Sequence, residues 1–247
     1  MLKDERKEAI MALLEQNKYQ SVDELVSALH YSPATIRRDI RALVCAGKAK
    51  KSYGGIALDT SDKPMVVRAH EFSTEKGTLA KRGSTLVGDG DTVFIAGSST
   101  TAHLLRPLCE KKGLTVVTND PTLALSFEER GVRTYVTGGS LQGGMLTGPL
   151  ATASVAAFSF DALFFSVTGI SETGALSVHS EAFASLLSAL FSRAEKRVCL
   201  AVDAKHGARA PFAVGDLSAV THLVGNTPPA ATLAARYPGT VFLSTEK

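Results

Sequence analysis

Apolar residues in the first part of the chain recur at helical spacing. Ile10 and Leu14 lie on one face of a predicted amphipathic helix over residues 4–17. A second helix is predicted after Ser21, because Ser21 and Glu24 match the reciprocal capping box that begins many helices. Leucines and valines at helical spacing follow this box, so the pattern predicts two short helices in succession.

A third helix follows after a short turn. Ser32 is placed to cap it, and Pro33 takes the first helical position, where a missing N–H costs nothing. Ile36 and Ile40 belong to its predicted buried stripe, and Gly47 is expected to end it.

Two short strands are predicted after this helix. The stretch KAKKSYGGIAL, residues 48–58, has a Tyr-Gly-Gly turn at residues 53–55 with strand-like sequence on both sides. Helix, turn, helix and basic hairpin in this order are the layout of a winged helix-turn-helix.

Beyond residue 70 the pattern changes to apolar runs separated by helical stretches. Near-continuous apolar strands joined by helices predict an α/β fold with a Rossmann-like, mostly parallel sheet covered on both faces. The strand-like runs cover residues 92–96, 114–118, 132–137, 162–168, 197–203 and 221–224.

Charge is concentrated in the first part. The chain carries a net charge of only +3, yet residues 32–55 alone carry +5, from six basic residues and one acidic residue, Asp39. On a helical projection Arg38 and Arg41 face away from the apolar stripe, Arg37 lies at its flank, and Asp39 lies on the other side. This local excess is what neutralising DNA phosphates requires. A charged surface helix without a partner is the alternative interpretation.

The predicted DNA-binding residues divide into two groups. Thr35, Arg38 and Arg41 are the expected base readers, because arginine pairs with guanine through two hydrogen bonds. The other expected contacts, chiefly to phosphates, come from Ser32, Arg37, Lys48, Lys50, Lys51 and Tyr53.

Polar and small residues follow the predicted strands of the larger part. Because ligands of such sheets bind at the carboxyl ends of the strands, these residues form the candidate site for a small anion. Each of them could instead be an ordinary capping or turn residue. The candidate effector-binding residues are Gly97, Ser98, Ser99, Thr100, Thr101, Thr118, Asn119, Asp120, Gly138, Gly139, Asp203 and Lys205.

Cysteine content and hydropathy indicate a cytoplasmic protein. Cys45, Cys109 and Cys199 are odd in number and far apart, so they are expected to be reduced, without metal-ligand spacing. The charged N-terminus does not resemble a signal peptide, and no apolar run reaches the roughly 18 residues of a membrane span. No metal or cofactor is predicted.

The first part resembles the helix-turn-helix signature of the DeoR family of bacterial transcriptional regulators. Its elements stand here as Arg6, Ile10, Leu14, Ser32 and the run Thr35-Ile36-Arg37-Arg38-Asp39-Ile40. The family's hairpin usually carries His-Gly-Gly, where this chain has Tyr53-Gly54-Gly55.

The larger part resembles the DeoR C-terminal sensor domain, which is itself similar to ribose-5-phosphate isomerase and CoA-transferase folds. The chain departs from the family's usual pattern in two places: Ala96 and Ser98 replace an acid and a glycine of its phosphate loop, and Gly225-Asn226 replaces Thr-Asp. The matching pieces are Glu75-Lys76, residues 88–95, 97–101, 115–120, 138–139 and 148–150, Asp161, and residues 203–207.

The resemblance implies a repressor of a sugar-utilisation operon that is relieved by a phosphorylated sugar. It divides the chain into a DNA-binding domain (residues 1–57), a linker (58–70) and an effector-sensing and oligomerisation domain (71–247). Operator DNA, a sugar phosphate and further copies of the chain, as homodimer or homotetramer, are the implied partners.

A sugar-phosphate isomerase with an appended helix-turn-helix is the alternative, although we expect no enzyme. Such an enzyme would need a general base beside the anion site. The available carboxylates are Asp89, Asp91, Asp120, Asp161, Glu181 and Asp203. No Walker A sequence or Gly-x-Gly-x-x-Gly occurs, and the stretch at residues 138–144 is expected to be a flexible loop.

Overall fold

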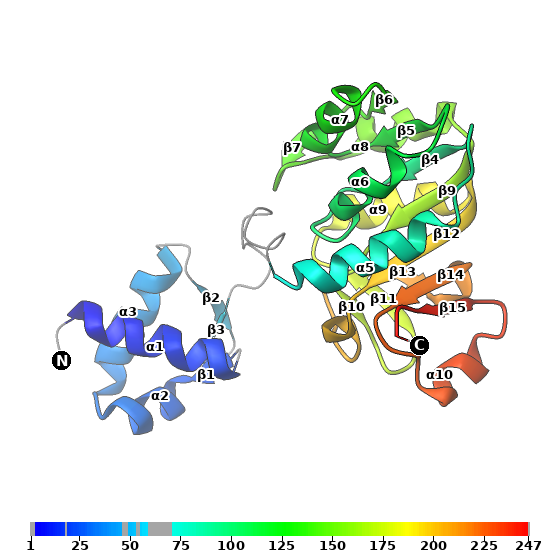
Figure 1. Cartoon of the computed structure of the whole chain (residues 1–247). Coiled ribbons are helices and arrows are strands. Elements are labelled where there is room, and N and C mark those ends of the chain that lie inside the picture. Colours follow the sequence, from blue (N-terminus) through cyan, green and yellow to red (C-terminus); the bar gives the residue numbers. More distant parts are fainter. Residues whose placement is uncertain (1–2, 18, 46–48, 53–54, 59–70, 247) are drawn as a thin grey trace. The chain divides into compact units, whose positions relative to one another are not determined.

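The chain folds into two compact units, residues 1–63 and residues 64–247. The structure is a computed structural model, and it describes residues 3–17, 19–45, 49–52, 55–58 and 71–246. We call the first unit the head and the second the body, and describe each by itself (Figure 1). The linker predicted over residues 58–70 lies outside the described residues, except for Leu58, which ends a strand.

Three helices form most of the head, as the sequence predicts. They are α1 (Lys3–Asn17), α2 (Val22–Leu29) and α3 (Pro33–Cys45). The capping box of α2 is present: the N–H of Glu24 donates to Ser21 Oγ at 3.1 Å, and the N–H of Ser21 donates to Glu24 Oε2 at 2.7 Å. The hydrogen bond that the Ser21 N–H donates to its carboxylate holds the pKa of Glu24 below its ordinary value.

A turn at His30 joins α2 to α3. His30 has φ of 57°, in the left-handed region, which ends α2 because the helix cannot continue through it. Ile36 and Ile40 of α3 are buried as predicted, so their face of the helix is the one held against the rest of the head. The other core residues of the head are Ile10, Leu14, Leu25, Leu43, Ala49 and Ile56.

The predicted hairpin is part of a three-stranded antiparallel sheet. β2 (Ala49–Ser52) pairs with β3 (Gly55–Leu58), and β3 also pairs with β1 (Tyr19–Ser21), which the sequence did not predict. Gly55 has to be glycine because any side chain there would collide with the backbone of Gln20 on the neighbouring strand. The predicted helix end at Gly47 lies outside the described residues.

A seven-stranded sheet is the framework of the body, and all its neighbouring strands are parallel (Figure 1). Its order is β15-β14-β12-β9-β4-β5-β6. The bounds are β4 Thr92–Ile95, β5 Thr115–Thr118, β6 Arg133–Val136, β9 Phe160–Phe165, β12 Ala194–Ala201, β14 His222–Gly225 and β15 Val241–Ser244.

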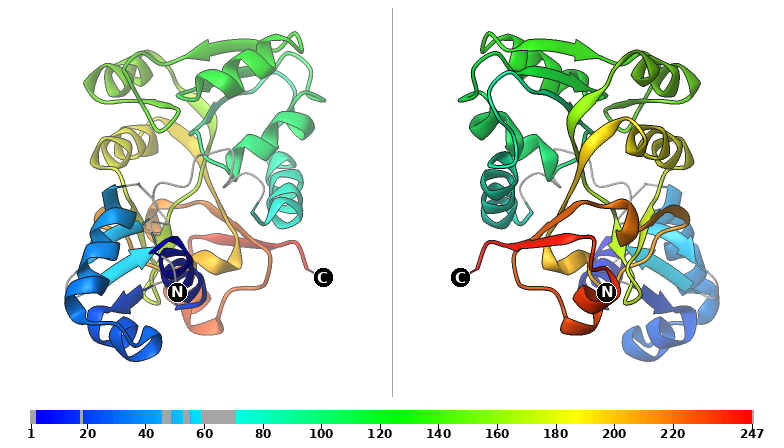
Figure 2. Two further views of the ribbon diagram at one scale, coloured as in Figure 1. Left: turned by 90° about the vertical axis from the view of Figure 1, so that its left-hand side faces the viewer. Right: turned by 90° about the vertical axis from the view of Figure 1, so that its right-hand side faces the viewer.

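Helices lie on both sides of this sheet, as Figure 2 shows. The long apolar runs are explained by this arrangement, because both faces of a covered strand are buried. One core contains residues of α5 (Ser73–Ser84) and α7 (Pro121–Glu128), and the other contains residues of α9 (Glu181–Phe191). Shorter helical segments are η1 Thr101–Leu104, α6 Leu105–Leu108, α8 Pro149–Ser154, η2 Val155–Ala157, η3 Asp203–Lys205, η4 Leu217–Ala219 and α10 Ala231–Arg236.

The strand order reverses between β4 and β9. The chain runs from β4 outward through β5 to β6, then returns to the other side of β4 with β9 and continues through β12, β14 and β15. In doubly wound sheets, ligands bind outside the carboxyl ends of the strands at such a reversal. The fold therefore directs attention to the residues that follow β4 and β9.

One prediction for the body is wrong. The stretch at residues 138–144, expected to be a flexible loop, contains β7 (Ser140–Gln142), which pairs with β8 (Met145–Thr147). Gly143 and Gly144 form the turn with φ of 57° and 85°, and two successive positive φ angles suit a tight hairpin turn. Glycine-rich sequence here makes a hairpin instead of a loose segment.

A second small sheet completes the body. It is antiparallel and consists of β10 (Gly169–Ile170), β11 (Ala175–Val178) and β13 (Phe212–Asp216). None of the helices among the described residues is long and apolar enough to cross a membrane.

Candidate functional site

The outer face of α3 carries exposed basic side chains. Arg37, Arg38 and Arg41 are all exposed, whereas Thr35 is half-buried. Ala34, beside them, is exposed and small, so it does not hold another surface away from the helix. The helix therefore presents the arginines to solvent, as the helical projection predicts.

Ser32 begins α3 and its hydroxyl is already engaged. Ser32 Oγ accepts the N–H of Thr35 at 3.3 Å and lies 3.0 Å from Thr35 Oγ1. The carbonyl of Ser32 accepts the N–H of Ile36 at 3.1 Å. Ser32 thus caps the helix, and the Thr35 hydroxyl is held at the same end.

Asp39 is not a surface residue, which the charge pattern did not reveal. It is fully buried and forms an ion pair with Arg6 of α1, with 2.5 Å between Arg6 Nε and Asp39 Oδ2. The guanidinium of Arg6 also lies 4.7 Å from the ring centroid of Tyr31, in the turn before α3. The hydrogen bond to Asp39 raises the pKa of Arg6.

This ion pair has a consequence for the outer face of α3. The acidic residue of the helix points inward, so its charge does not offset Arg37, Arg38 and Arg41 at the surface. Arg6 and Asp39 are both elements of the helix-turn-helix signature, and the structure gives the physical reason: together they connect α1 with α3.

The basic hairpin is only partly described. Lys50 and Lys51 are consecutive in β2 and lie opposite Ala57 and Ile56 of β3. Lys48 and Tyr53 lie outside the described residues, so their predicted contacts stay predictions.

In the body, the turn after β4 is folded by its own hydroxyl groups. Thr101 Oγ1 donates to the carbonyl of Ala96 at 2.7 Å, and Ser98 Oγ accepts the N–H groups of Thr100 and Thr101 at 3.3 and 3.1 Å. Thr100 and Thr101 are fully buried, and Ser99 is 9% exposed. The turn from residue 97 to 101 is therefore a compact, hydroxyl-lined corner at the point where the strand order reverses.

Asn119, after β5, holds this turn in place. Its side-chain oxygen accepts the N–H of Gly97 at 2.8 Å, and its side-chain nitrogen donates to the carbonyl of Leu146 at 3.1 Å. Gly97 has no room for a side chain, because a Cβ there would collide with Met145 and approach Asp120 Cβ to 2.9 Å. Asn119 and Gly97 thus fix the turn against β8.

The neighbours of Asn119 also have structural partners. Thr118 Oγ1 donates to the carbonyl of Ile95 at 2.6 Å. Asp120 Oδ1 accepts the N–H groups of Thr122 and Leu123, both at 3.0 Å, and so caps α7. Burial raises the pKa of Asp120.

Lys205 brings a cation to the turn, as predicted. Its Nζ donates to Ser166 Oγ at 2.5 Å and to Thr100 Oγ1 at 3.4 Å. Ser166 follows β9 and donates in turn to the carbonyl of Leu200 at 2.5 Å. Residues after β4, β9 and β12 therefore meet around one ammonium group. Ser166 is a member of this group that the sequence reasoning missed.

Among the described residues, no hydrogen bond joins the turn after β4 to the remaining predicted residues, Asp203, Gly138 and Gly139, and each of them contacts another part of the body. Asp203 is exposed, and its Oδ1 accepts the N–H of Thr227 at 3.3 Å. Gly138 and Gly139 follow β6 and contact other elements: Gly138 N–H donates to Ser154 Oγ at 3.2 Å, and Gly139 faces the carbonyl of Thr147 at φ of 124°.

Lys76 of α5 is a second lysine at the same turn, and the predicted site did not include it. Lys76 is only 4% exposed, and its Nζ donates to Ser99 Oγ at 3.1 Å. A signal was present in the sequence. Lys76, Leu79, Ala80 and Gly83 have the spacing of one helix face, and all four are buried. A lysine within a buried stripe needs a polar partner.

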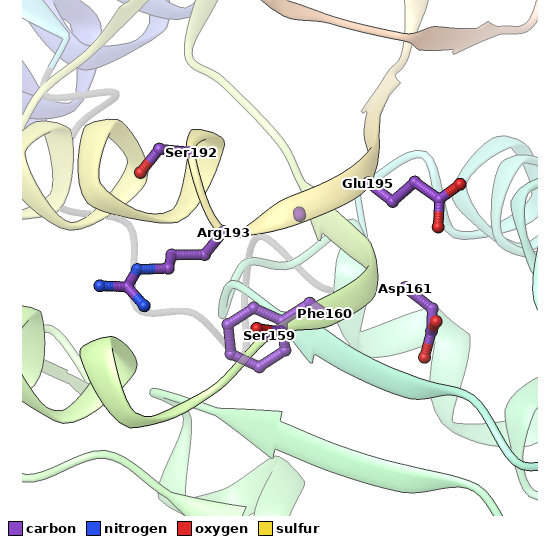
Figure 3. A pocket seen from close by; sticks show the side chains of 7 residues that line it. Ser159, Phe160, Asp161, Ser192, Arg193 and Glu195 are labelled. Carbon is purple, nitrogen blue, oxygen red and sulfur yellow. The ribbon is translucent and has the colours of Figure 1, made fainter.

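A hollow of about 410 Å³ lies at the opposite edge of the sheet, at the amino ends of β9 and β12 (Figure 3). It is wide open, and the side chains of Arg193 and Glu195 point in different directions in the figure. Asp161 in its wall accepts the N–H of Thr92 at 2.7 Å. Since the hydroxyl-lined turn lies at the carboxyl ends, this hollow is separate from the candidate anion site.

Five of the six carboxylates that an isomerase could use are divided between the two edges of the sheet, and the sixth, Glu181, begins α9. Asp89 and Asp91 precede β4 and accept the N–H groups of Lys112 and Gly88. Asp161 begins β9 at the same edge. Asp120 and Asp203 follow strands at the other edge. Among the described residues no three His, Cys, Asp or Glu side chains gather as a metal site would require.

Comparisons with known families cover both units. The DeoR-like helix-turn-helix domain matches residues 6–62, and the DeoR C-terminal sensor domain matches residues 71–227.

Similar proteins of known name are transcriptional regulators. The repressor CsqR of Escherichia coli K12 is 29% identical over 94% of this chain and 90% of its own length. The glycerol-3-phosphate regulon repressor of Haemophilus influenzae is 33% identical, and the lactose phosphotransferase system repressor of Lactococcus lactis is 30% identical; each alignment covers 56% of this chain. The chain spans only about half the length of these two relatives, 55% and 57%.

Similar solved structures are more distant. Ribose 5-phosphate isomerase A of Methanocaldococcus jannaschii has a TM-score of 0.42 at 16% identity, covering 55% of each chain. The translation initiation factor eIF-2B of Pyrococcus horikoshii OT3 has a TM-score of 0.47 at 16% identity, covering 90% of this chain and 86% of that one. The two domain matches together extend over most of the sequence, and the chain therefore belongs to the DeoR family of helix-turn-helix transcriptional regulators.

Proposed function

We propose that the protein is a repressor of a sugar-utilisation operon, which binds operator DNA through the head and releases it when a phosphorylated sugar binds the body. The observation that carries the proposal is the outer face of α3. Arg37, Arg38 and Arg41 are exposed there, while Asp39 of the same helix is buried against Arg6. A surface with this charge suits the DNA major groove.

The roles within α3 follow from position. Arg38 and Arg41, which project from the outer face, read base edges, and Thr35 contributes from the start of the helix. Arg37 lies nearer the edge of that face and binds phosphate, together with Lys48, Lys50 and Lys51 of the hairpin. Tyr53, which lies between the two strands in sequence, also contacts the DNA backbone. Ser32 serves as a cap that orients the helix, since its hydroxyl is already bound.

The effector binds at the turn after β4. The hydroxyl groups of the turn and the ammonium group of Lys205 suit a phosphoryl group, and the turn lies where the strand order reverses. Two relatives are named as repressors of a glycerol-3-phosphate regulon and of a lactose phosphotransferase system. Gly138, Gly139 and Asp203 lie toward the periphery and contact the non-phosphorylated part of the effector.

The active form is a homodimer or homotetramer assembled through the body. One winged head contacts a short stretch of DNA, so two heads are needed to read half-sites separated by whole helical turns. The effector acts by binding the DNA-free and DNA-bound arrangements unequally.

An isomerase is the less favoured function. It requires a general base beside the anion, yet the oxygen Oδ1 of Asp120 is already occupied in capping α7, and Asp203 is exposed at the rim. Asp89, Asp91 and Asp161 lie at the other edge of the sheet.

A thermal-shift screen of sugar phosphates against the purified protein tests the proposal. A phosphorylated ligand is expected to raise the melting temperature, by mass action, and the unphosphorylated sugar is not. Lys205→Ala should abolish the shift while retaining operator binding. Steady turnover of a sugar phosphate, with no sequence-specific DNA binding, would replace the repressor with the isomerase.

A further inference from the structure

One continuous segment of the body contains no charged residue. Residues 134–160, which we call the uncharged segment, include no Asp, Glu, Lys, Arg or His, although Asp, Glu, Lys and Arg make up 21% of the chain. The segment is not a core element, because most of its residues are exposed or half-buried. Its length is comparable with the roughly 20–30 residues that each partner contributes to a standard interface, and charged residues are depleted at the centre of such interfaces.

Large apolar side chains of the uncharged segment are exposed. Four of the seven large apolar residues that are exposed among the described residues belong to it: Tyr135 and Val136 of β6, Leu141 of β7 and Leu150 of α8. Leu150 lies beside Gly138, which follows β6, so α8 is held next to the end of that strand. Figure 1 shows β6, β7 and α8 at one end of the body. Exposed apolar side chains that gather in this way mark interaction sites.

β6 is also an unprotected edge of the seven-stranded sheet. One side of its backbone pairs with β5, and no other strand among the described residues pairs with it. Many proteins protect such an edge with lysine, proline or a β-bulge, because free N–H and C=O groups of an edge pair readily with another strand. The sequence of β6 is Arg-Thr-Tyr-Val, without lysine or proline, and its register with β5 is regular. This edge is therefore open to pairing.

The other edge of the same sheet differs from β6. In β15 only Val241 is exposed, and the three residues that follow it are half-buried. Two charged residues, Glu246 and Lys247, come directly after this strand in the sequence. Of the two edges, β6 is the one that combines exposure with an uncharged, apolar surrounding.

We propose that β6 pairs antiparallel with β6 of a second copy of the chain, about a two-fold axis, and that the uncharged segments of both copies form the core of this interface. The proposal deepens the proposed assembly through the body, on which it rests. The choice of a second copy follows from charge. A different protein is usually recognised through complementary charges, which this segment does not offer. Two copies of an uncharged surface do not repel each other, and a two-fold axis brings the same patch to both sides.

The antiparallel direction follows from the charges that flank the segment. Arg133 is exposed at the start of β6, and Arg130 is exposed shortly before it. In a parallel pair the two copies of Arg133 would lie side by side, and like charges in that position are destabilising. In an antiparallel pair each Arg133 lies opposite the uncharged end of the partner strand. Glu128 and Glu129 are exposed nearby, so the rim of the interface carries both signs of charge.

The hairpin of β7 and β8 presents its part of the surface in a fixed position. Leu141 of β7 lies opposite Leu146 of β8. The N–H of Leu146 donates to the carbonyl of Asn119 at 2.8 Å, and Asn119 Nδ2 donates to the carbonyl of Leu146 at 3.1 Å. Because these bonds attach the hairpin to the body, little conformational entropy has to be lost there when two copies associate.

The test measures self-association of the full chain by analytical ultracentrifugation over a dilution series. Val136→Lys places a charge on the edge strand, and Leu150→Lys places one on α8. A two-fold interface contains each substitution twice, so each should raise the dissociation constant about 100-fold or more. Val241→Lys is the matched control, since Val241 is 48% exposed on the opposite edge strand and Val136 is 49% exposed. The control should change the dissociation constant little.

Hydrogen exchange followed by mass spectrometry tests the strand pairing on the same proteins. At wild-type concentrations well above the dissociation constant, residues 133–136 should exchange more slowly than in dilute solution, because their free N–H groups become paired. Residues 241–244 should exchange alike at both concentrations. Val136→Lys should show no slowing at residues 133–136. Circular dichroism spectra that match wild type identify the variants as folded.

The outcomes separate the surface from the assembly. Wild type that stays monomeric at its highest soluble concentration would overturn the second copy as the occupant, and the proposed assembly with it; DNA binding is measured separately and can still hold. Association that Val136→Lys and Leu150→Lys leave unchanged, or that Val241→Lys weakens equally, would overturn this surface but not the assembly. Weaker association of both variants, without concentration-dependent exchange at residues 133–136, would overturn the strand pairing.

Discussion

The head and the body place their functional polar groups in opposite ways. On α3 of the head, the basic side chains Arg37, Arg38 and Arg41 are exposed, and the acidic residue is buried. In the body, Thr100 and Asn119 are fully buried and bonded to their surroundings. The face of α3 presents long, exposed side chains to solvent, whereas the turn after β4 is made of buried polar groups that are already held in place by hydrogen bonds.

The difference follows from the sizes of the two anions proposed as ligands. DNA is a long polyanion that cannot enter a protein, so it has to be met by side chains on the surface. A small phosphoryl group can be surrounded by buried hydroxyl and N–H groups. Substitutions of the exposed arginines of α3 should therefore change binding with little effect on stability, whereas substitutions of the buried polar residues in the body should change both.

The largest expected effect is that of Asn119→Ala in the body. The change leaves the buried N–H of Gly97 and the carbonyl of Leu146 without their side-chain partner. Each unpaired buried group costs about 1–3 kcal/mol, so the loss of both bonds should lower the free energy of unfolding by roughly 2–6 kcal/mol. Urea denaturation measures this loss.

Asn226→Ala is the matched control for Asn119→Ala. Asn226 is an amide on the same unit, half-buried, with its amide nitrogen 3.4 Å from the carbonyl of Glu75. Removing the Asn226 side chain should lower the free energy of unfolding clearly less than removing that of Asn119. Equal losses for the two variants would show that Asn119 is not the residue that fixes the turn.

Next in size is Arg38→Ala in the head. It should weaken binding to the specific operator by about 1–3 kcal/mol and relax the choice of one base pair, because a base contact is lost. The free energy of unfolding should stay within about 0.5 kcal/mol of wild type, since Arg38 is exposed. Fluorescence anisotropy with specific and random DNA gives the affinities.

Arg37→Ala provides the contrast within α3. As a proposed phosphate contact, Arg37 should strengthen binding to all sequences alike, and its loss should lower the slope of log affinity against log salt by about 1. If both arginine variants lose specificity equally, the division between base readers and phosphate contacts is incorrect.

Ser32→Ala should have a smaller effect, and one on stability. Removing the cap leaves the N–H of Thr35 without its side-chain acceptor and should lower the free energy of unfolding of the head by about 1 kcal/mol. Ser32→Asn, which also caps helices well, should recover it. Thermal unfolding measures both variants. A head that is equally stable with alanine would return Ser32 to the set of candidate DNA contacts.

The smallest effect concerns the pH dependence of the body. Because burial raises the pKa of Asp120, the folded protein binds this proton more tightly than the unfolded chain does. Its contribution to stability is therefore fully present below the unfolded pKa, about 3.9, and is lost as pH rises through the raised value. Asp120→Asn keeps the cap without the charge, so its stability relative to wild type should increase with pH. Urea denaturation of both proteins from pH 4 to pH 7 tests whether this difference in stability increases or decreases with pH.

Much of the fold could be predicted because burial on both faces leaves a continuous apolar run. The run at residues 92–96 became β4, and the run at residues 114–118 became β5. β15, at the edge of the sheet, was not predicted, since VFLS at Val241–Ser244 is a short run at the end of the chain. β1, three residues long, is a strand because β3 lies beside it, which local sequence does not encode.

The site was harder to predict, since its members meet only through the fold. Residues directly after strands, such as Ser98 and Lys205, could be found because parallel strands end at one edge. Ser166 follows β9 in the same way, but it lies inside the run at residues 162–168, which was predicted to be strand throughout. The pairing of Asp39 with Arg6 was not predicted, because Arg6 is 33 residues away and two helices earlier. Long-range pairs of this kind are decided by packing.

The central claim is that an anion bound in the body controls DNA binding by the head. The most direct measurement is the affinity of the full chain for an operator, isolated by in vitro selection, with and without the sugar phosphate that most raises the melting temperature. We predict that the sugar phosphate weakens specific binding about 5- to 150-fold, within the usual range of allosteric coupling, and that Lys205→Ala removes the response but not the binding. An operator affinity that stays the same when the body is saturated with the sugar phosphate would contradict the account.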